Sequence, residues 1–217
     1  MSAYCDVAPG HEWHGPYHDT EYGFPLRGDA ELFERLILEI NQAGLSWLTI
    51  LKKREGFRAA YRGFDPAVVA RFGARDVRRL MADAGIIRNR LKIEAAIANA
   101  KTLLALRHSH GSFAEWLDGH LGVDATTQGR DGRTQRRDGR TQGRDGRTQG
   151  RKDARRLRSK KEWVDLFKRT FRFTGGEIVG EFLLSTGYLP GAHRQSCPVY
   201  ARVQEARPPY LEVRGER

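Results

Sequence analysis

The chain has 217 residues, 39% of them hydrophobic and 30% charged, a balance typical of a soluble protein with one sizeable core. No stretch approaches the roughly 18 consecutive apolar residues of a membrane span, and the first residues lack the basic and apolar regions of a secretory signal, so we expect a cytoplasmic protein without membrane association. The net charge of +11 favours a polyanionic partner such as nucleic acid, although ribosomal and membrane-surface proteins are also basic.

Helical patterns follow one another through the first half of the chain. Asp29 is expected to cap a helix from about Ala30 to Gln42, in which apolar residues recur at helical spacing. A second helix is predicted to begin at Asp65 and Pro66, because Asp is a preferred N-cap and Pro is favoured at the first helical position. Three more are predicted from Asp76 to about Ala82, from Arg90 to about Arg107, and from the capping box Ser112–Glu115.

A repeat of seven residues dominates residues 127–151. It reads GRDGRTQ at 129–135, RRDGRTQ at 136–142 and GRDGRTQ again at 143–149. A coiled coil needs apolar residues at two positions of each heptad, and this repeat has none, so we predict a disordered insertion in a surface loop. Eight Arg and three Asp give residues 129–151 a charge of +5, and the alternative is therefore a cationic tether for a polyanion.

Two further helices are predicted after the repeat. Ser159 and Glu162 form a second capping box, and residues 175–186 form the last helix. Residues 171–175 are the nearest candidate for a strand and are too short to build a sheet. We therefore expect an all-α fold with about seven helices around one core. Its single domain would comprise residues 1–126 and 152–200, followed by a C-terminal tail at 201–217.

Two cysteines and two histidines near the chain ends are candidates for a metal site. They are Cys5, His18, His193 and Cys197. Zinc accepts thiolate and imidazole ligands in a tetrahedron, and a site with all four positions filled by protein would be structural. The spacing is not that of a zinc finger, and His11 and His14 are rival ligands from the same N-terminal segment. The alternative is that these residues are ordinary buried or surface groups.

Four ordered motifs carry a family resemblance. They are YHDTEYGFP at residues 17–25, QAGLSW at 42–47, LKKRE at 51–55 and DAGIIR at 83–88. Together they closely resemble the 3-methyladenine DNA glycosylase I family, within the helix-hairpin-helix DNA glycosylase superfamily. The resemblance is close over residues 1–108 and weaker over 160–198. It implies a helix-hairpin-helix fold in which the four candidate ligands bind a structural zinc ion that joins the two chain ends.

The resemblance also implies the residues of a base pocket. Glu39 is the implied catalytic residue, whose oxygens accept hydrogen bonds from the flipped base. Its place beside an apolar stripe fits equally a boundary Glu that reaches solvent. Trp47 is the implied stacking surface, although a Trp in a helical protein is more often a core aromatic. Tyr17 and His14 are the implied pocket walls.

The implied DNA-binding hairpin spans Leu80 to Lys92. Gly85 would permit its tight turn, while Arg88, Arg90 and Lys92 would contact phosphates. Lys52 and Lys53, in the basic motif, are further expected DNA contacts. The second glycine common in such hairpins is absent, and the pattern alone fits any connection between two helices.

The implied activity is that of a monofunctional, monomeric glycosylase acting on double-stranded DNA in base excision repair. Water would hydrolyse the N-glycosidic bond of 3-methyladenine and leave an abasic site, with no catalytic Asp assigned. Val7 and His14 stand where the family usually has aromatic residues, and Tyr22 where it often has Trp, so we expect a less aromatic pocket. The alternatives are a glycosylase for a different alkylated purine and a non-catalytic, zinc-stapled DNA-binding protein.

Overall fold

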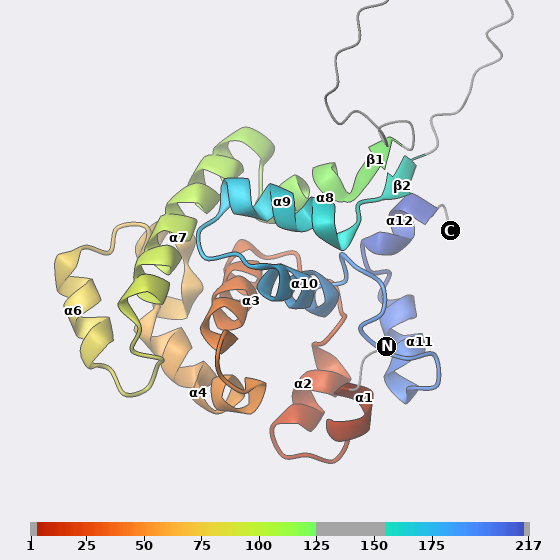
Figure 1. Cartoon of the computed structure of the whole chain (residues 1–217), viewed down its shortest axis with the longest axis horizontal. Helices are drawn as coiled ribbons and strands as arrows, with labels where there is room; N and C mark the ends of the chain where they lie inside the picture. Colours follow the sequence, from red (N-terminus) through yellow and green to blue (C-terminus); the bar gives the residue numbers. More distant parts are fainter. Residues whose placement is uncertain (1–3, 125–154, 215–217) are drawn as a thin grey trace, which may run out of the picture.

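The structure is a computed structural model that describes residues 4–124 and 155–214. Within these ranges the chain is mostly helical (Figure 1). The elements are α1 (Tyr4–Val7), α2 (His14–Thr20), α3 (Asp29–Gln42), α4 (Trp47–Ala60), the 3-10 turn η1 (Arg62–Phe64), α5 (Pro66–Val69), α6 (Ala74–Ala82), α7 (Arg90–His110), α8 (Phe113–Leu121), β1 (Gly122–Asp124), β2 (Arg155–Leu157), α9 (Lys160–Thr170), α10 (Gly176–Ser185), α11 (Pro198–Glu205) and α12 (Tyr210–Arg214). The predicted disordered insertion at 127–151 lies outside the described residues. None of the described helices is long and apolar enough to cross a membrane.

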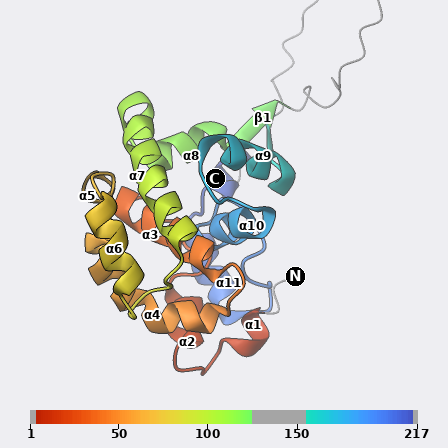
Figure 2. The ribbon, with the colours of Figure 1, turned by 60° about the vertical axis from the view of Figure 1, so that its left-hand side comes forward.

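Helix α3 lies at the centre of the molecule. All of its residues from Leu32 to Asn41 are buried, and it packs against α4, α7, α8 and α10 (Figures 1 and 2). A helix buried on every side is expected to be apolar all round, so the four polar residues in this stretch each need a partner or a purpose. Asn41 has one, because its side-chain amide donates to the carbonyl oxygen of Ile37 at 2.8 Å.

Aromatic rings from the two halves of the chain complete the core. Phe113 of α8 stacks on Phe182 of α10 with ring centroids 5.9 Å apart, and Trp116 of α8 meets Phe171 edge-on at 5.6 Å. Such pairs add stability beyond the area they bury. The segments before and after residues 125–154 therefore form a single core.

Most predicted helices are present, with corrections at their ends. Asp29 does not cap α3, because Gly28 holds the N-cap position and the Asp29 carboxylate accepts from the backbone N–H of Phe113 at 2.8 Å. This bond ties α3 to α8. Asp65 and Ser159 do cap their helices. Helix α7 runs three residues past Arg107 and ends at His110, with Gly111 as its C-cap.

The prediction of an all-α fold without strands is wrong in one place. Strands β1 and β2 form an antiparallel pair in which Gly122 opposes Leu157 and Asp124 opposes Arg155. Each strand has only three residues, too few to show an alternating pattern in the sequence. The ladder brings together the two chain segments that flank residues 125–154.

Residues 201–214 are part of the folded domain, not the tail expected after residue 200. Val203 and Tyr210 are buried, and the backbone N–H of Tyr210 donates to the carbonyl oxygen of Gly187 at 3.2 Å. Gly187 has φ +75°, and a Cβ there would lie 2.8 Å from the Cβ of Pro208. This glycine is needed both to end α10 and to admit the C-terminal segment.

Candidate active site and metal site

A cavity of about 340 Å³ opens beside the central helix. Its walls come from α1, α2, α3, α4, α10 and the segment after α2, and the residues are Tyr4, Tyr17, Tyr22, Glu39, Gln42, Trp47 and Glu181. The volume lies at the lower end of the range of small-molecule pockets, about 300 to 1,000 Å³. Four aromatic rings and two carboxyl groups suit a flat, positively charged ligand.

Glu39 has the most unusual environment of these residues. It is 4% exposed, and no described residue donates a hydrogen bond to its carboxylate. Burial raises the pKa of Glu39 to about 8, while the guanidinium of Arg35 opposes this rise and the carboxylate of Glu181 adds to it. The carboxyl group therefore keeps its hydrogen-bonding capacity for something that enters the cavity.

Aromatic side chains form the rest of the cavity wall. The rings of Tyr17 and Trp47 lie 5.2 Å apart between centroids, as do those of Tyr4 and Tyr22. The hydroxyl oxygen of Tyr17 is buried and has no hydrogen-bond partner among the described residues. Burial raises the pKa of this phenol well above its ordinary value, so it remains an O–H donor at neutral pH.

A charge network packs against Tyr17, one of the residues that line the cavity. Arg35 is 2% exposed, places its guanidinium 4.8 Å from the Tyr17 ring centroid, and donates to Glu21 at 3.1 Å. Arg54 of α4 donates to both oxygens of Glu21, at 2.6 and 2.7 Å. Arg35 also donates to the backbone oxygen of Ser185 at 3.2 Å. These bonds link α3, α4 and α10 below the Tyr17 ring.

The structure brings together Tyr17, Glu39 and Trp47, which sequence reasoning assigned to one pocket. It does not place His14 there, because His14 lies outside the cavity lining and its Nδ1 is 2.9 Å from the hydroxyl of Tyr4. The Tyr4 ring lines the cavity together with those of Tyr17, Tyr22 and Trp47, so four aromatic rings line it although residues 7 and 14 are not Trp, Tyr or Phe. Val7 is 63% exposed and does not line the cavity.

Sequence reasoning missed three lining residues. They are Tyr4, Gln42 and Glu181. Glu181 carried a usable signal, because it is a carboxyl group within an apolar helix, the same signal that singled out Glu39. Tyr4 carried none, because its position depends on how the first helix folds over the pocket.

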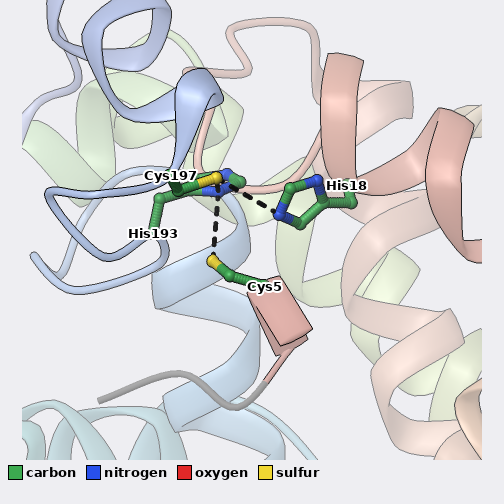
Figure 3. A group of neighbouring side chains, drawn as sticks. All are labelled: Cys5, His18, His193 and Cys197. Carbon is green, nitrogen blue, oxygen red and sulfur yellow. Dashed lines mark hydrogen bonds between the residues drawn. The ribbon is translucent and has the colours of Figure 1, made fainter. Parts of the chain in front are cut away.

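The four predicted metal ligands meet at the junction of the two chain ends (Figure 3). All are buried, and their ligand atoms lie within 4.8 Å of one another. Sγ of Cys197 is 3.7 Å from Nε2 of His18 and 3.5 Å from Nδ1 of His193, and Sγ of Cys5 is 3.7 Å from the same Nδ1. This group could hold a metal ion.

The second nitrogen of each imidazole is also engaged. Nδ1 of His18 lies 2.7 Å from the Asp19 carboxylate, and Nε2 of His193 lies 2.7 Å from the backbone oxygen of Tyr22. Such contacts orient a metal-binding ring and select its tautomer. The rival His11 accepts backbone hydrogen bonds from residues 13 and 14 and lies outside the cluster.

The predicted hairpin corresponds to α6, residues 83–89 and α7. Asp83 accepts from the backbone N–H of Gly85 at 2.7 Å, and Lys53 donates to the backbone oxygen of Ala84 at 2.6 Å. Gly85 does not have a positive φ. A Cβ on Gly85 would lie 2.9 Å from Oδ1 of Asp83, the atom that accepts from its own N–H. The close approach of α4 to this turn requires glycine at residue 56 instead, because a Cβ on Gly56 would lie 2.4 Å from the Gly85 oxygen.

Lys92 does not fit its predicted phosphate contact. It is 5% exposed, and its Nζ donates to the backbone oxygens of Asn41 at 3.0 Å and Ala43 at 2.7 Å. The ammonium group therefore caps the carbonyl end of α3. Lys52, Arg88 and Arg90 are exposed.

The sequence of this chain resembles those of known proteins. The methyladenine glycosylase family matches residues 9–200. The chain belongs to the methyladenine glycosylase family. DNA-3-methyladenine glycosylase 1 of Escherichia coli (strain K12) is 48% identical over 101 residues, 46% of this chain and 54% of that protein, and a Haemophilus influenzae DNA-3-methyladenine glycosylase is 45% identical over 101 residues, 46% and 55%. The matched part thus spans about half the length of these curated relatives.

Solved structures of methyladenine glycosylases align over most of the chain. A crystal structure of 3-methyladenine DNA glycosylase I is 34% identical, covers 89% of this chain and 97% of its own, and gives a TM-score of 0.67. The enzyme from Staphylococcus aureus is 30% identical over 90% and 95%, with a TM-score of 0.66. A variant of such an enzyme, solved in complex with 3-methyladenine, is 30% identical over 91% and 97%, with a TM-score of 0.68.

Proposed function

We propose that this chain is a DNA-3-methyladenine glycosylase. It would hydrolyse the N-glycosidic bond of 3-methyladenine in double-stranded DNA and leave an abasic site for base excision repair. The observation that carries the proposal is the aromatic cavity that contains Glu39, a buried carboxyl group to which no described residue donates a hydrogen bond. The names of its relatives and a related structure with 3-methyladenine bound support the substrate.

The cavity offers a reason to prefer a methylated base. Adenine alkylated on N3 within DNA is cationic, and a cation is attracted both to a carboxylate and to the electron-rich faces of aromatic rings. Glu39 oxygens would accept from the exocyclic amine, Trp47 would stack on the purine, and the Tyr17 hydroxyl would gain the partner that it lacks. The nucleotide must first rotate out of the duplex.

The residues present fit a monofunctional glycosylase. Alkylation already makes the purine a good leaving group, so the protein has to bind, orient and stabilise charge as the bond stretches, with water as nucleophile. Among the described residues, no Lys lines the cavity, so none is placed there to form a covalent intermediate with the sugar. No Asp lines the described cavity either, and we assign no catalytic Asp. Because one chain supplies every lining residue, we propose a monomer, acting in the cytoplasm.

We propose that α6 and α7 form a helix-hairpin-helix that grips the DNA backbone. The turn containing Gly85 and the N-terminus of α7 present backbone N–H groups, which suit phosphate oxygens. Lys52, Arg88 and Arg90 are exposed near it, and Lys53 braces the turn through Ala84. These contacts read no sequence, as a repair enzyme that searches duplex DNA requires.

We propose that Cys5, His18, His193 and Cys197 bind one structural zinc ion. With Zn–S near 2.3 Å and Zn–N near 2.0 to 2.1 Å, a tetrahedron has S···N edges of about 3.6 Å. The distances of 3.5 and 3.7 Å between these atoms support zinc. When bound, the ion would supply a cross-link between α1, α2 and the C-terminal segment, and no chemistry on the base.

The test is to incubate the protein with duplexes that carry different methylated bases and to identify what is released. Release of 3-methyladenine, with an abasic site left uncut, is the expected result. Release of another methylated purine alone would favour the alternative of a glycosylase for a different alkylated purine. DNA binding with no release from any duplex would favour the non-catalytic reading.

A substitution at Glu39 sharpens this test. Glu39→Gln keeps the shape and one acceptor but removes the charge, so single-turnover excision should fall by roughly ten- to a thousandfold, the range for a lost hydrogen bond to a charged partner. Glu31→Gln is the matched control, because it changes an exposed residue of the same helix. Wild-type excision by a folded Glu39→Gln protein would contradict the assignment.

A further inference from the structure

Glu181 is a second carboxyl group in the cavity, and the proposed chemistry above does not use it. It lies on α10, which packs along α3, and it lines the same cavity as Glu39. The hydroxyl of Tyr22 donates to its Oε2 at 3.3 Å. Two carboxyl groups from neighbouring helices thus face one small, largely aromatic space.

The charged groups around this pair are few. Arg35 acts on Glu39 from α3 but is already bonded to Glu21 and to the oxygen of Ser185. Lys160 and Glu177 act on Glu181 from the solvent side, with opposite signs, and pair with each other at 3.2 Å. The remaining titratable groups that face the cavity are the phenols of Tyr4, Tyr17 and Tyr22.

We propose that Glu181 determines specificity by forming, with Glu39, a carboxyl pair matched to a cationic purine. This inference rests on the proposed function and goes beyond it by naming a residue and a mode of discrimination. Two carboxyl groups that share one site hold a proton between them, because both cannot easily ionise together. Burial raises the pKa of both Glu39 and Glu181, and the Glu181 carboxylate raises the pKa of Glu39 further, which supports such sharing.

The pair distinguishes charged from neutral bases through that proton. A cationic base can displace it to solvent, after which both carboxylates face the positive charge. A neutral adenine cannot balance the charge of two carboxylates. The pair therefore keeps its proton when adenine enters, and adenine gains no ionic contact. Selection of the methylated base is therefore linked to release of a proton.

The linkage has a definite sign. The Glu181 carboxylate raises the pKa of Glu39, so Glu181→Gln should lower it. Excision of a cationic base by the wild type should rise with pH as Glu39 ionises. In Glu181→Gln the midpoint of that rise should move to lower pH by about one unit, and the preference for 3-methyladenine over undamaged adenine should fall about tenfold, the equivalent of one unit.

The experiment is a pair of pH profiles for wild type, Glu181→Gln and Glu31→Gln. Glu31→Gln removes an exposed carboxylate from α3, the helix that carries Glu39, and Glu31 is not among the charges that act on either member of the pair, so its midpoint should match that of the wild type. Single-turnover excision gives the first profile. The carboxyl ¹³C shift of Glu39 in the unliganded protein gives the second and needs no activity.

The outcomes separate the two claims. Midpoints that coincide for Glu181→Gln and the wild type in both profiles would overturn the carboxyl pair, whatever the enzyme excises. If Glu181→Gln shifts the Glu39 titration but the wild type releases no methylated base, the result would support the carboxyl pair and contradict the proposed function. A shift confined to Glu181→Gln in both profiles is the expected result.

Discussion

The raised pKa of Glu39 connects its proposed role in base recognition to the stability of the fold. A Glu in an unfolded chain ionises near 4.5, whereas burial raises the pKa of Glu39 to about 8 in the folded chain. Between these values the folded chain holds a proton that the unfolded chain has lost. Stability from this residue is therefore full below pH 4.5 and declines as pH rises towards 8.

Replacing Glu39 by Gln should therefore stabilise the protein at high pH. The amide carries no charge to bury, so Glu39→Gln should melt at a higher temperature than the wild type at pH 8, and the difference should shrink as pH falls towards 4.5. Thermal melts across this range measure it, with Glu31→Gln as control. A gain in melting temperature that does not vary with pH would show that ionisation is not its cause.

At the scale of single residues, the sequence was informative where a side chain contradicts its surroundings. Glu39 stands out because a carboxyl group beside an apolar stripe needs a reason, and Tyr17 and Trp47 came from motifs. Tyr4 and His14 could not be separated from the sequence, because both lie near the predicted metal ligands. Which of them reaches the cavity depends on the packing of α1 against α2.

Elements were predictable where caps and apolar spacing agree, as in α9 with its capping box Ser159 and Glu162. Helix α4 was missed because four consecutive charged residues, KKRE at 52–55, hide its buried face. Its N-cap Ser46, which accepts from the backbone N–H of Thr49 at 3.2 Å, was the available signal. Two residues of the charged run have partners in the fold. Lys53 donates to the Ala84 oxygen in the turn between α6 and α7, and Arg54 donates to Glu21.

The contact between α4 and the hairpin turn yields a prediction. Gly→Ala in a helix usually stabilises by up to about 1 kcal/mol. Gly56→Ala should instead destabilise by about 1 to 3 kcal/mol, because its Cβ would lie 2.4 Å from a backbone oxygen that cannot rotate away. Urea unfolding of the wild type and Gly56→Ala measures the change in the free energy of unfolding and shows whether it is a loss or a gain.

Gly119→Ala in α8 is the matched control for that experiment. A Cβ at Gly119 would have no neighbour within 4 Å, so this substitution should be neutral or stabilising. Equal effects at the two sites would contradict the close approach of α4 to the turn.

At the scale of the whole molecule, the cluster of two Cys and two His residues joins segments that the sequence separates by almost the full chain. The two cysteines could be named as candidate ligands because Cys is rare in the sequence, whereas His18 could be preferred to His11 and His14 only through the family resemblance. What could not be foreseen is that residues beyond Cys197 continue into α11 and α12 and pack on the domain.

Removal of one ligand should loosen this junction. Metal analysis should find about one zinc per chain, and Cys197→Ser should lower the melting temperature, since metal binding in such sites contributes to folding. Ser196→Ala, at an exposed neighbouring residue, should melt like the wild type. Protein that is folded in the presence of zinc, contains no zinc and melts at the same temperature as Cys197→Ser would rule out a zinc cross-link at this junction.

The segment with the GRDGRTQ repeat can be tested by deletion across the β1–β2 ladder. The ladder pairs Asp124 with Arg155, so a short turn can join its ends. A protein lacking residues 129–151 should keep its melting temperature and its single-turnover excision. Its DNA affinity should fall and depend less steeply on salt, because +5 of charge is removed. Loss of folding on deletion would contradict this prediction.

The same ladder bears on how the gene can change. A connection whose two ends are already held side by side is closed at a free-energy cost that grows only with the logarithm of its length, about 0.6 kcal/mol for each doubling. Adding or losing one seven-residue unit between Asp124 and Arg155 therefore alters the stability of the domain by much less than a typical core substitution. The number of repeat units can therefore change at little cost to the fold, whereas a change in the cavity or in the Cys and His cluster would alter the proposed function.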